Sequence, residues 1–486
     1  MKEGMGGMFK KFIIGFTRIF CMLAVFTIIA YAIMGFKLFI AKNVLGIMYK
    51  IALISAIVLL TYFLYRVSNK KCQWFWMVLI CIGIVIRLVY AVSVRAPIYN
   101  DQLVCLNAAQ HSVRGDFSWA NLEYFQVVAY QIPFVLYEAV ILKIFGTVRA
   151  LYIFNGIFSI LTCLMIYLIV KKLYDKNTAL MITAIFSCFP EQISRVSFLY
   201  NYIISGFFFL VAIYFFVTIC RDCDKDENNF RRNLYLSLLT GLFFGISNLF
   251  RKEAVVGFLG AECWFIYYFI SRCRRENMRF LLLHTLSYMI VIYAVYKAVN
   301  LVVDFSIIHT GISPNGIKNR CPYWIVVCGL TPDNYGIYST KYIYIQGIRD
   351  KNEQFVAFKS IMHDIFDTQN FKSILSFFFN KGYYMWGEAY YLNKFYKYMG
   401  ISKILRATLI VFDHFAYTLV FLLSAVGLKK KQYNNFVAFI SIVIIGFFLA
   451  YVIKEIHIQY RYFTFLTAVI LSASGVDYLR KRKNKL

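Results

Sequence analysis

The sequence predicts an all-α polytopic membrane protein with about 12 transmembrane helices and two large extracytoplasmic segments. Of its 486 residues, 60% are hydrophobic and only 16% are charged, and the mean hydropathy is +0.63. Apolar runs of about 20 residues recur along the chain, and each is long enough to cross a bilayer. A soluble domain fills its interior at ordinary composition, so this excess of apolar residues indicates helices that face lipid.

Twelve apolar runs are candidate spans. The first run does not look like a cleaved signal peptide, because it is long, lacks a small-residue cleavage site and is followed by further spans. In chain order the candidates are 12–34, 45–65, 74–94, 148–170, 178–192, 197–219, 234–250, 254–270, 280–300, 405–427, 434–454 and 459–479.

The net charge of +28 is carried by short basic clusters between the apolar runs. This distribution is typical of the positive-inside bias of membrane proteins and argues against nucleic acid as a partner. We expect contact with anionic membrane lipids instead. The clusters are Lys10-Lys11, Arg66 with Lys70-Lys71, Lys171-Lys172, Arg231-Arg232, Arg272 with Arg274-Arg275, Lys429-Lys430-Lys431, and Arg480-Lys481-Arg482-Lys483.

The segment 124–145 is apolar enough to span, yet it carries Gln126, Gln131, Pro133 and Glu138. Counting it as a span would move every later basic cluster to the outside. The charge bias therefore favours a helix that lies at the outer interface. With this choice, all basic clusters and both termini are cytoplasmic, and we expect a multi-pass protein of the plasma membrane.

This topology divides the chain into four parts. Residues 1–73 hold two additional N-terminal spans, and residues 74–300 form a membrane core whose first outer loop is 95–147. Residues 301–404 form a second extracytoplasmic region with turn signals at Ser313–Gly316 and Thr331–Asn334. Residues 405–486 add the last spans and a basic cytoplasmic tail.

Asp101 follows the apolar run 74–94 and therefore lies at the outer mouth of a span. An acid near lipid is costly, by about 2.5–3.5 kcal/mol on insertion scales, and is a functional candidate for that reason. Two interpretations stand side by side: a general base or metal ligand at the membrane surface, and the N-cap of a helix over 102–113. No cofactor is assigned, and a divalent metal ion is compatible with this residue type.

Arg251-Lys252-Glu253 forms a short turn between two spans and faces outward on this topology. Basic residues are disfavoured in short outer turns, so the pair needs a reason. A phosphate-bearing ligand near the outer leaflet would supply one, because arginine binds phosphate through two parallel hydrogen bonds. The alternative is a pair of snorkelling cations balanced by Glu253.

Arg461 and Tyr462 open the last span, where Arg461 is a second outward cation. Together with Arg251 it would form an anion site if the helices bring the two side chains close. Tyr462 belongs to the aromatic belt expected at this depth. The chain shows no nucleophile-elbow, P-loop, dinucleotide-binding or zincin spacing.

Several short motifs in order resemble the bacterial members of the dolichyl-phosphate-mannose protein mannosyltransferase-like superfamily, membrane glycosyltransferases of the GT-C fold (family 39 type). The resemblance runs from about Trp74 to the C-terminus. Its motifs are Asp101, Tyr130-Gln131-Ile132-Pro133, Phe145-Gly146, Arg149 to Asn155, Lys171 to Tyr174, Phe189-Pro190, Gly241 to Gly245 with Arg251 and Glu253, and Arg461-Tyr462.

The resemblance implies transfer of a sugar from a polyprenyl-phosphate carrier to an outer-face acceptor in cell-envelope glycan assembly, with inversion at the anomeric carbon. It makes Asp101 the catalytic acid of the first outer loop and matches Arg251 and Arg461 to cationic positions near the carrier phosphate. We expect Lys252 and Tyr462, their neighbours in the chain, to take part in the same substrate-binding site. The resemblance does not indicate which sugar is transferred, nor whether the acceptor is a glycan, a lipid or a protein.

Two other functions fit a protein of this size and composition. A polysaccharide flippase or transporter would have buried ionisable residues in mid-span and related halves, and no internal repeat is evident here. A polysaccharide polymerase or ligase would also have a large outer loop, but its catalytic feature is expected within 301–404.

Overall fold

The computed structural model describes residues 5–32, 73–94, 96–224, 229–273, 278–367, 369–387, 403–429 and 434–483, with isolated positions between 51 and 62. Within these ranges, ten helices are long and apolar enough to cross a membrane. They are α1 (Met5–Ala30), α4 (Gln73–Ser93), α8 (Val148–Leu173), α11 (Tyr202–Asp224), α12 (Phe230–Phe250), α13 (Ala254–Arg272), α14 (Met278–His309), α19 (Lys403–Gly427), α20 (Asn435–Ile453) and α21 (Tyr462–Lys483).

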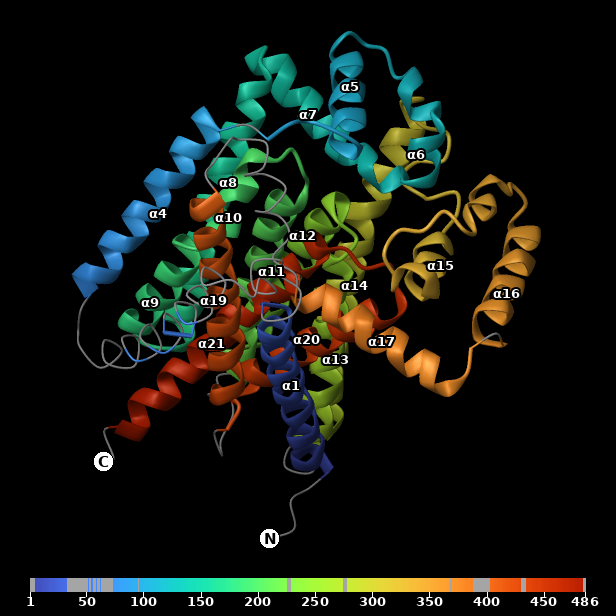
Figure 1. Cartoon of the computed structure of the whole chain (residues 1–486). Helices are drawn as coiled ribbons and strands as arrows, with labels where there is room; N and C mark the ends of the chain where they lie inside the picture. Colours follow the sequence, from blue (N-terminus) through green and yellow to red (C-terminus); the bar gives the residue numbers. More distant parts are fainter. Residues whose placement is uncertain are drawn as a thin grey trace.

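The helices form one bundle with a cap of shorter helices at one end (Figure 1). The cap contains α5 (Asp101–Val113), α6 (Glu123–Val127) and α7 (Ile132–Phe145), while α15 (Trp324–Leu330), α16 (Lys351–Asp367) and α17 (Phe371–Gly387) lie beside the bundle. The start of α1 and the end of α21 lie at the opposite end (Figure 1). The largest apolar core joins the spanning helices, and a smaller one holds α5 and α7 against the cap end of α8 and α14.

Basic side chains gather at the end of the bundle opposite the cap. Four described contacts join predicted basic clusters to other helices there, so these clusters share one end. The contacts are Lys172 Nζ to Thr218 Oγ1 at 2.5 Å, Arg232 to Asp222 at 3.4 Å, Arg272 Nη2 to the carbonyl of Cys223 at 3.2 Å, and the ion pair of Arg480 with Asp175.

Ten of the twelve predicted spans correspond to these helices, and two need comment. The run 45–65 lies outside the ranges that the structure describes. The run 178–192 is not one regular helix: α9 (Lys176–Ser187) has 12 residues, and the short helix α10 (Pro190–Ser194) and a 3-10 turn (Arg195–Ser197) follow it. The ambiguous segment 124–145 is not a span either, since α7 has only 14 residues.

The predicted span 178–192 is not one continuous helix, because Arg87 of α4 donates hydrogen bonds to the free carbonyls at the C-terminal end of α9. Its Nη2 donates to the carbonyl of Phe186 at 3.0 Å, its Nη1 donates to that of Ser187, and its Nε donates to Ser159 Oγ at 3.0 Å. Gly83 allows this approach, since a Cβ there would collide with the Ser187 backbone. Free carbonyls inside a membrane need such partners, so a buried cation on one helix terminates another.

Glycines explain two of the sequence motifs. Gly146 ends α7 in the left-handed conformation, with φ at +66°, and Thr147 then caps α8 by accepting a hydrogen bond from the Arg149 amide at 3.3 Å. Gly241 and Gly245 of α12 face α14, where a Cβ would lie 2.6 Å from the Ile292 carbonyl oxygen and 2.9 Å from Val299 Cβ. The two helices therefore pack closely along a stripe of small residues.

Candidate active site and a buried ion cluster

Asp101 is the first residue of α5, not its N-cap. Asn100 holds the N-cap position without a side-chain hydrogen bond and has a φ of +50°, which is uncommon for a residue other than glycine. Such backbone costs about 1–3 kcal/mol and persists only where its surroundings hold it. The capping interpretation of Asp101 is therefore wrong.

Asp101 lies in the electrostatic range of Arg251. Desolvation by the surrounding protein raises the pKa of Asp101 above the ordinary value of an aspartate, while the nearby Tyr124 hydroxyl and the charge of Arg251 oppose this rise. The two side chains come from α5 and from the end of α12, which are about 150 residues apart in the chain. The predicted acid and the first predicted cation thus lie close enough for their charges to interact.

Arg251 is fixed by a carboxylate and by aromatic rings. Its Nε and Nη2 donate to the two carboxylate oxygens of Glu253, each at 3.1 Å, and Nη2 also donates to the Tyr202 hydroxyl at 2.6 Å. The guanidinium lies 4.1 Å from the centre of the Tyr202 ring, 5.4 Å from that of Tyr460 and 5.7 Å from that of Tyr130. Its Nη1 enters no hydrogen bond among the described residues and remains for a ligand.

The turn after α20 contributes Lys454 and Glu455, a second cation and a second acid, to the surroundings of Arg251. Lys454 Nζ lies 2.9 Å from Glu253 Oε1, so Glu253 balances two cations. Burial disfavours the Glu253 carboxylate, yet Arg251 and Lys454 outweigh it and keep its pKa below the ordinary value. We call Asp101, Arg251, Glu253, Lys454 and Glu455 the Asp101 cluster.

Glu455 is a second carboxyl in the Asp101 cluster. Burial raises its pKa to about 7, with a further rise from the negative charge of Asp101. Its amide donates to the Ile325 carbonyl at 2.7 Å, which holds the turn after α20 against α15. The cluster therefore contains two acids that change charge above the usual range of carboxyl groups, and both are general-base candidates.

Amide side chains hold the cap in place over the Asp101 cluster. Gln102 Oε1 accepts the Leu199 amide at 3.0 Å, and Asn201 Nδ2 donates to Gln131 Oε1 at 2.8 Å and to the Phe250 carbonyl at 2.6 Å. The residue before Arg251 is thus tied to the start of α7. This explains why Gln131 and Asn201 are needed although neither carries charge.

Lys381 of α17 positions the turn that carries Glu455. Its ammonium is 2% exposed and donates to the carbonyls of Val452 at 3.0 Å, Lys454 at 2.9 Å and Gly329. Burial lowers the pKa of Lys381 to about 7. An ammonium with three carbonyl partners joins the helices beside the bundle to the Asp101 cluster.

Arg461 does not join Arg251. Its Nη2 lies 3.5 Å from Glu191 Oε2, and its guanidinium lies 4.2 Å from the centre of the Tyr417 ring. Glu191 also pairs with Arg195 at 2.5 Å, accepts the Tyr417 hydroxyl and donates its own amide to Asp413 Oδ1 at 2.9 Å. These five residues form a buried ion cluster in the bundle interior, each of them at most 4% exposed.

Tyr462 is a packing residue in the structure. It is 2% exposed, its ring lies under the Arg195 guanidinium at 4.9 Å, and it fills the space left by Gly206, where a Cβ would collide with it. Tyr460, two residues earlier, covers Arg251 instead. The turn 460–462 therefore connects the Asp101 cluster to the buried ion cluster.

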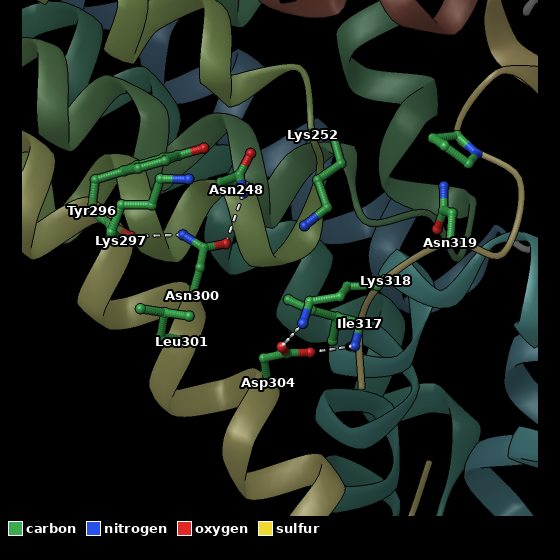
Figure 2. A pocket seen from close by; sticks show the side chains of 11 residues that line it. Asn248, Lys252, Tyr296, Lys297, Asn300, Leu301, Asp304, Ile317, Lys318 and Asn319 are labelled. Atoms are coloured by element: carbon green, nitrogen blue, oxygen red, sulfur yellow. Dashed lines mark hydrogen bonds and ion pairs between the residues drawn. The ribbon is translucent and has the colours of Figure 1, made fainter. Parts of the chain in front are cut away.

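Lys252 lines a pocket between α12 and α14 to which Arg251 does not contribute (Figure 2). Adjacent residues at a helix end project in different directions, so the predicted pair divides between two surroundings. Of the predicted site residues, Asp101 and Arg251 come together, whereas Lys252, Arg461 and Tyr462 lie elsewhere.

Sequence reasoning missed Glu191, Arg195, Asp413 and Lys381. The only signal was an ionisable residue within or beside an apolar run, which is costly without a partner. Among the described residues, no three His, Cys, Asp or Glu side chains are close enough to hold a metal ion.

Comparisons with known proteins give a family match and distant structural likenesses. No curated protein matches the chain. The structure of the Archaeoglobus fulgidus oligosaccharyltransferase in the apo form has a TM-score of 0.46 and 15% identity, covering 84% of this chain and 50% of that one. The same enzyme with an inhibitory peptide and a dolichol-phosphate has a TM-score of 0.42 and 12% identity, covering 86% and 52%. This chain thus spans about half the length of the solved structures that it matches.

The family model described as dolichyl-phosphate-mannose-protein mannosyltransferase matches residues 131–302. The matched segment begins at Gln131 and ends within α14, so it includes Arg251 but neither Asp101 nor Arg461. It covers about a third of the chain. The match confirms the resemblance over residues 131–302: this segment is similar to the dolichyl-phosphate-mannose-protein mannosyltransferase family model.

Proposed function

We propose that this protein is a membrane glycosyltransferase that moves a sugar from a polyprenyl-phosphate-linked donor to an acceptor on the outer face of the membrane. The observation that carries the proposal is the meeting of Asp101 and Arg251 at the cap end of the bundle. At the cap end of the bundle, the carboxylate suits an acceptor hydroxyl, whose proton it can take, and the guanidinium suits the phosphate of a lipid-linked donor.

The charges of the Asp101 cluster suggest one sequence of events. The acceptor hydroxyl gives its proton to the Asp101 carboxylate as its oxygen forms a bond to the anomeric carbon. The bond from that carbon to the carrier phosphate breaks, and the phosphate leaves with the electron pair. Attack opposite the leaving group inverts the anomeric centre. Arg251 Nη1 stabilises the charge that grows on the phosphate.

The proposal places the cap outside the cell and both termini in the cytoplasm of a cell with this protein in its plasma membrane. The basic clusters at the other end of the bundle support this orientation through the positive-inside bias. The product belongs to cell-envelope glycans, and the acceptor is a hydroxyl of a glycan, a lipid or a protein.

The test compares Asp101→Asn with Glu455→Gln in membranes of a strain that lacks the gene. Envelope glycans and lipid-linked sugars are measured by mass spectrometry, with Asp333→Asn as the control, because Asp333 is exposed and lies outside the cluster. We expect Asp101→Asn to lower the transfer rate by about 10²–10⁴-fold. Full activity in that variant, at normal expression, would refute the assigned base.

A second candidate function is translocation of a lipid-linked sugar. The buried ion cluster favours it, because ionisable residues inside a membrane commonly mark a transport path. A reconstituted assay separates the two functions. Transfer without movement of the donor between leaflets supports the enzyme, whereas donor movement without any new glycosidic bond supports the transporter.

A further inference from the structure

A pocket of about 450 Å³ lies between α12, α14 and the segment 317–322, away from the Asp101 cluster (Figure 2). Three lysines line it, namely Lys252, Lys297 and Lys318, and Asp304 is its one carboxylate. Its remaining polar wall consists largely of asparagine side chains. The pocket therefore has an excess of positive charge and neutral hydrogen-bonding groups beside it.

One wall of the pocket is clamped in place by Asp304. Its Oδ1 accepts the Ile317 amide at 2.8 Å, and its Oδ2 pairs with Lys318 Nζ at 3.2 Å. Gly316 has a φ of +59°, and a Cβ at this position would collide with Asp304 Oδ1. The segment after α14 can fold back onto the helix only because Gly316 has no side chain. This wall of the pocket therefore requires a glycine at that position.

Two side chains in the pocket each have a polar group without a hydrogen-bond partner in the described structure. Asn248 is 5% exposed and donates to Asn300 Oδ1 at 2.8 Å, while Asn300 donates to the Tyr296 carbonyl at 2.8 Å. This chain of bonds fixes Asn248 so that its own Oδ1 accepts no hydrogen bond in the described structure. A buried acceptor without a donor costs about 1–3 kcal/mol, so the site suits a ligand that donates to it.

Lys252 is the second unpartnered group. Its ammonium is half-buried and makes no hydrogen bond or ion pair within the described ranges, and Figure 2 shows it directed into the pocket. Burial lowers the pKa of Lys252 to about 8, opposed by the charge of Asp304. Because Asp304 already pairs with Lys318, it does not neutralise Lys252. An anion would.

The pocket opens onto the part of α14 that faces lipid. Leu301, Val302 and Phe305 are 60–67% exposed, as expected for side chains in contact with acyl chains. Lys297 lies among them and is exposed as well. Charged side chains beside an apolar, lipid-facing surface mark the level of the headgroups.

We propose that this pocket binds the phosphate of an anionic glycerophospholipid whose headgroup carries a hydroxyl. The ammonium groups of Lys252 and Lys297 bind the phosphate, the headgroup hydroxyl donates to Asn248 Oδ1, and the acyl chains lie along α14. The carrier lipid offers the same phosphate chemistry, and the experiment separates the two sources. The site is distinct from the Asp101 cluster, since Arg251 and Lys252 face different surroundings.

The experiment measures lipid binding to the purified full-length protein by native mass spectrometry. The probes are phosphatidylglycerol, polyprenyl phosphate and, as a zwitterionic reference without a headgroup hydroxyl, phosphatidylcholine. The variant is Lys252→Gln with Lys297→Gln, and Lys297→Gln alone serves if the double variant does not fold. Lys143→Gln is the matched control, because Lys143 is an exposed cation at the end of α7, outside the pocket.

We expect the wild type to prefer phosphatidylglycerol to phosphatidylcholine. The double variant should lose about tenfold or more of its phosphatidylglycerol affinity, because each lysine near the membrane surface strengthens the binding of an anionic lipid. Selective loss of polyprenyl phosphate would instead assign the pocket to the carrier and overturn the glycerophospholipid. Equal binding by wild type and variant, or the same loss in Lys143→Gln, would overturn the site itself.

Discussion

Arg251 and Lys252 are neighbours in the chain, yet their side chains belong to different sites. Arg251 is held by Glu253 and the Tyr202 hydroxyl, and it approaches Asp101, whereas Lys252 lies in the pocket against α14. Their shared position in a short turn predicted one anion site. The structure separates them because α12 ends at Phe250, and the residues after it no longer share a face.

The Tyr124 hydroxyl tunes the carboxyl that we assign as the base. It lowers the pKa of Asp101, against the desolvation that raises it. Tyr124→Phe removes this effect and therefore raises the pKa further, so less of the ionised base is present at low pH. We expect the acid limb of the pH–rate profile to move to higher pH.

The matched control for that measurement is Tyr137→Phe, which also removes the hydroxyl of a partly buried tyrosine in the cap. Its profile should stay that of the wild type, because Tyr137 does not affect the pKa of Asp101. A profile for Tyr124→Phe that does not move, or that moves to lower pH, would contradict this role.

Glu191 binds two guanidinium groups at once, so its charge is needed in the buried ion cluster. Glu191→Gln leaves Arg195 and Arg461 without a counter-ion, and we expect the free energy of unfolding to fall by about 3–5 kcal/mol. Denaturation of the purified protein in detergent measures this loss. Glu353→Gln, at an exposed position of α16, should be close to neutral, and comparable stability of the two variants would be the contrary result.

At the scale of elements, α9 shows how a tertiary contact overrides a hydrophobic pattern. The run 178–192 reads as one helix, but Arg87 binds the carbonyls of Phe186 and Ser187 and Pro190 begins a new turn. The contact joins residues about 100 positions apart, so no local pattern reveals it. The ends of α7 and α8, by contrast, follow from Gly146 and Thr147, which are local signals.

We expect Arg87→Leu to destabilise the bundle more than a surface substitution does. It leaves two carbonyls inside the membrane without donors, at about 1–3 kcal/mol each. The apparent melting temperature in detergent should fall clearly, while Arg114→Leu, at an exposed position after α5, should leave it within error. Equal melting temperatures would show that water or other side chains satisfy the end of α9.

At the scale of the whole molecule, the candidate active site and the predicted basic clusters lie at opposite ends of the bundle. The Asp101 cluster is at the cap, and the contacts of Asp175 with Arg480 and of Cys223 with Arg272 are at the other end. Composition and hydropathy were enough to predict ten of the twelve spans and this asymmetry, since both depend on runs of residue types. The partners of Arg461 were not predictable, because Glu191 and Tyr417 approach it from distant helices.

The orientation of the bundle is open to a direct test. Arg114→Cys, on the cap, should react with a membrane-impermeant maleimide in intact cells, and Lys171→Cys should react only after permeabilisation. Both positions are exposed, and the background is one whose own thiols do not label. Labelling of position 171 in intact cells would reverse the topology and remove the Asp101 cluster from the outer face.

The Arg87 contact also constrains how the chain enters the membrane. With 12 residues, α9 is too short to cross a bilayer alone, and the carbonyls at its open end would have no donor in lipid. The cation that satisfies those carbonyls is on α4, which is synthesised earlier. We therefore expect α9 to insert beside α4 after that helix is in place, so that the earlier helix acts as a template for the later one.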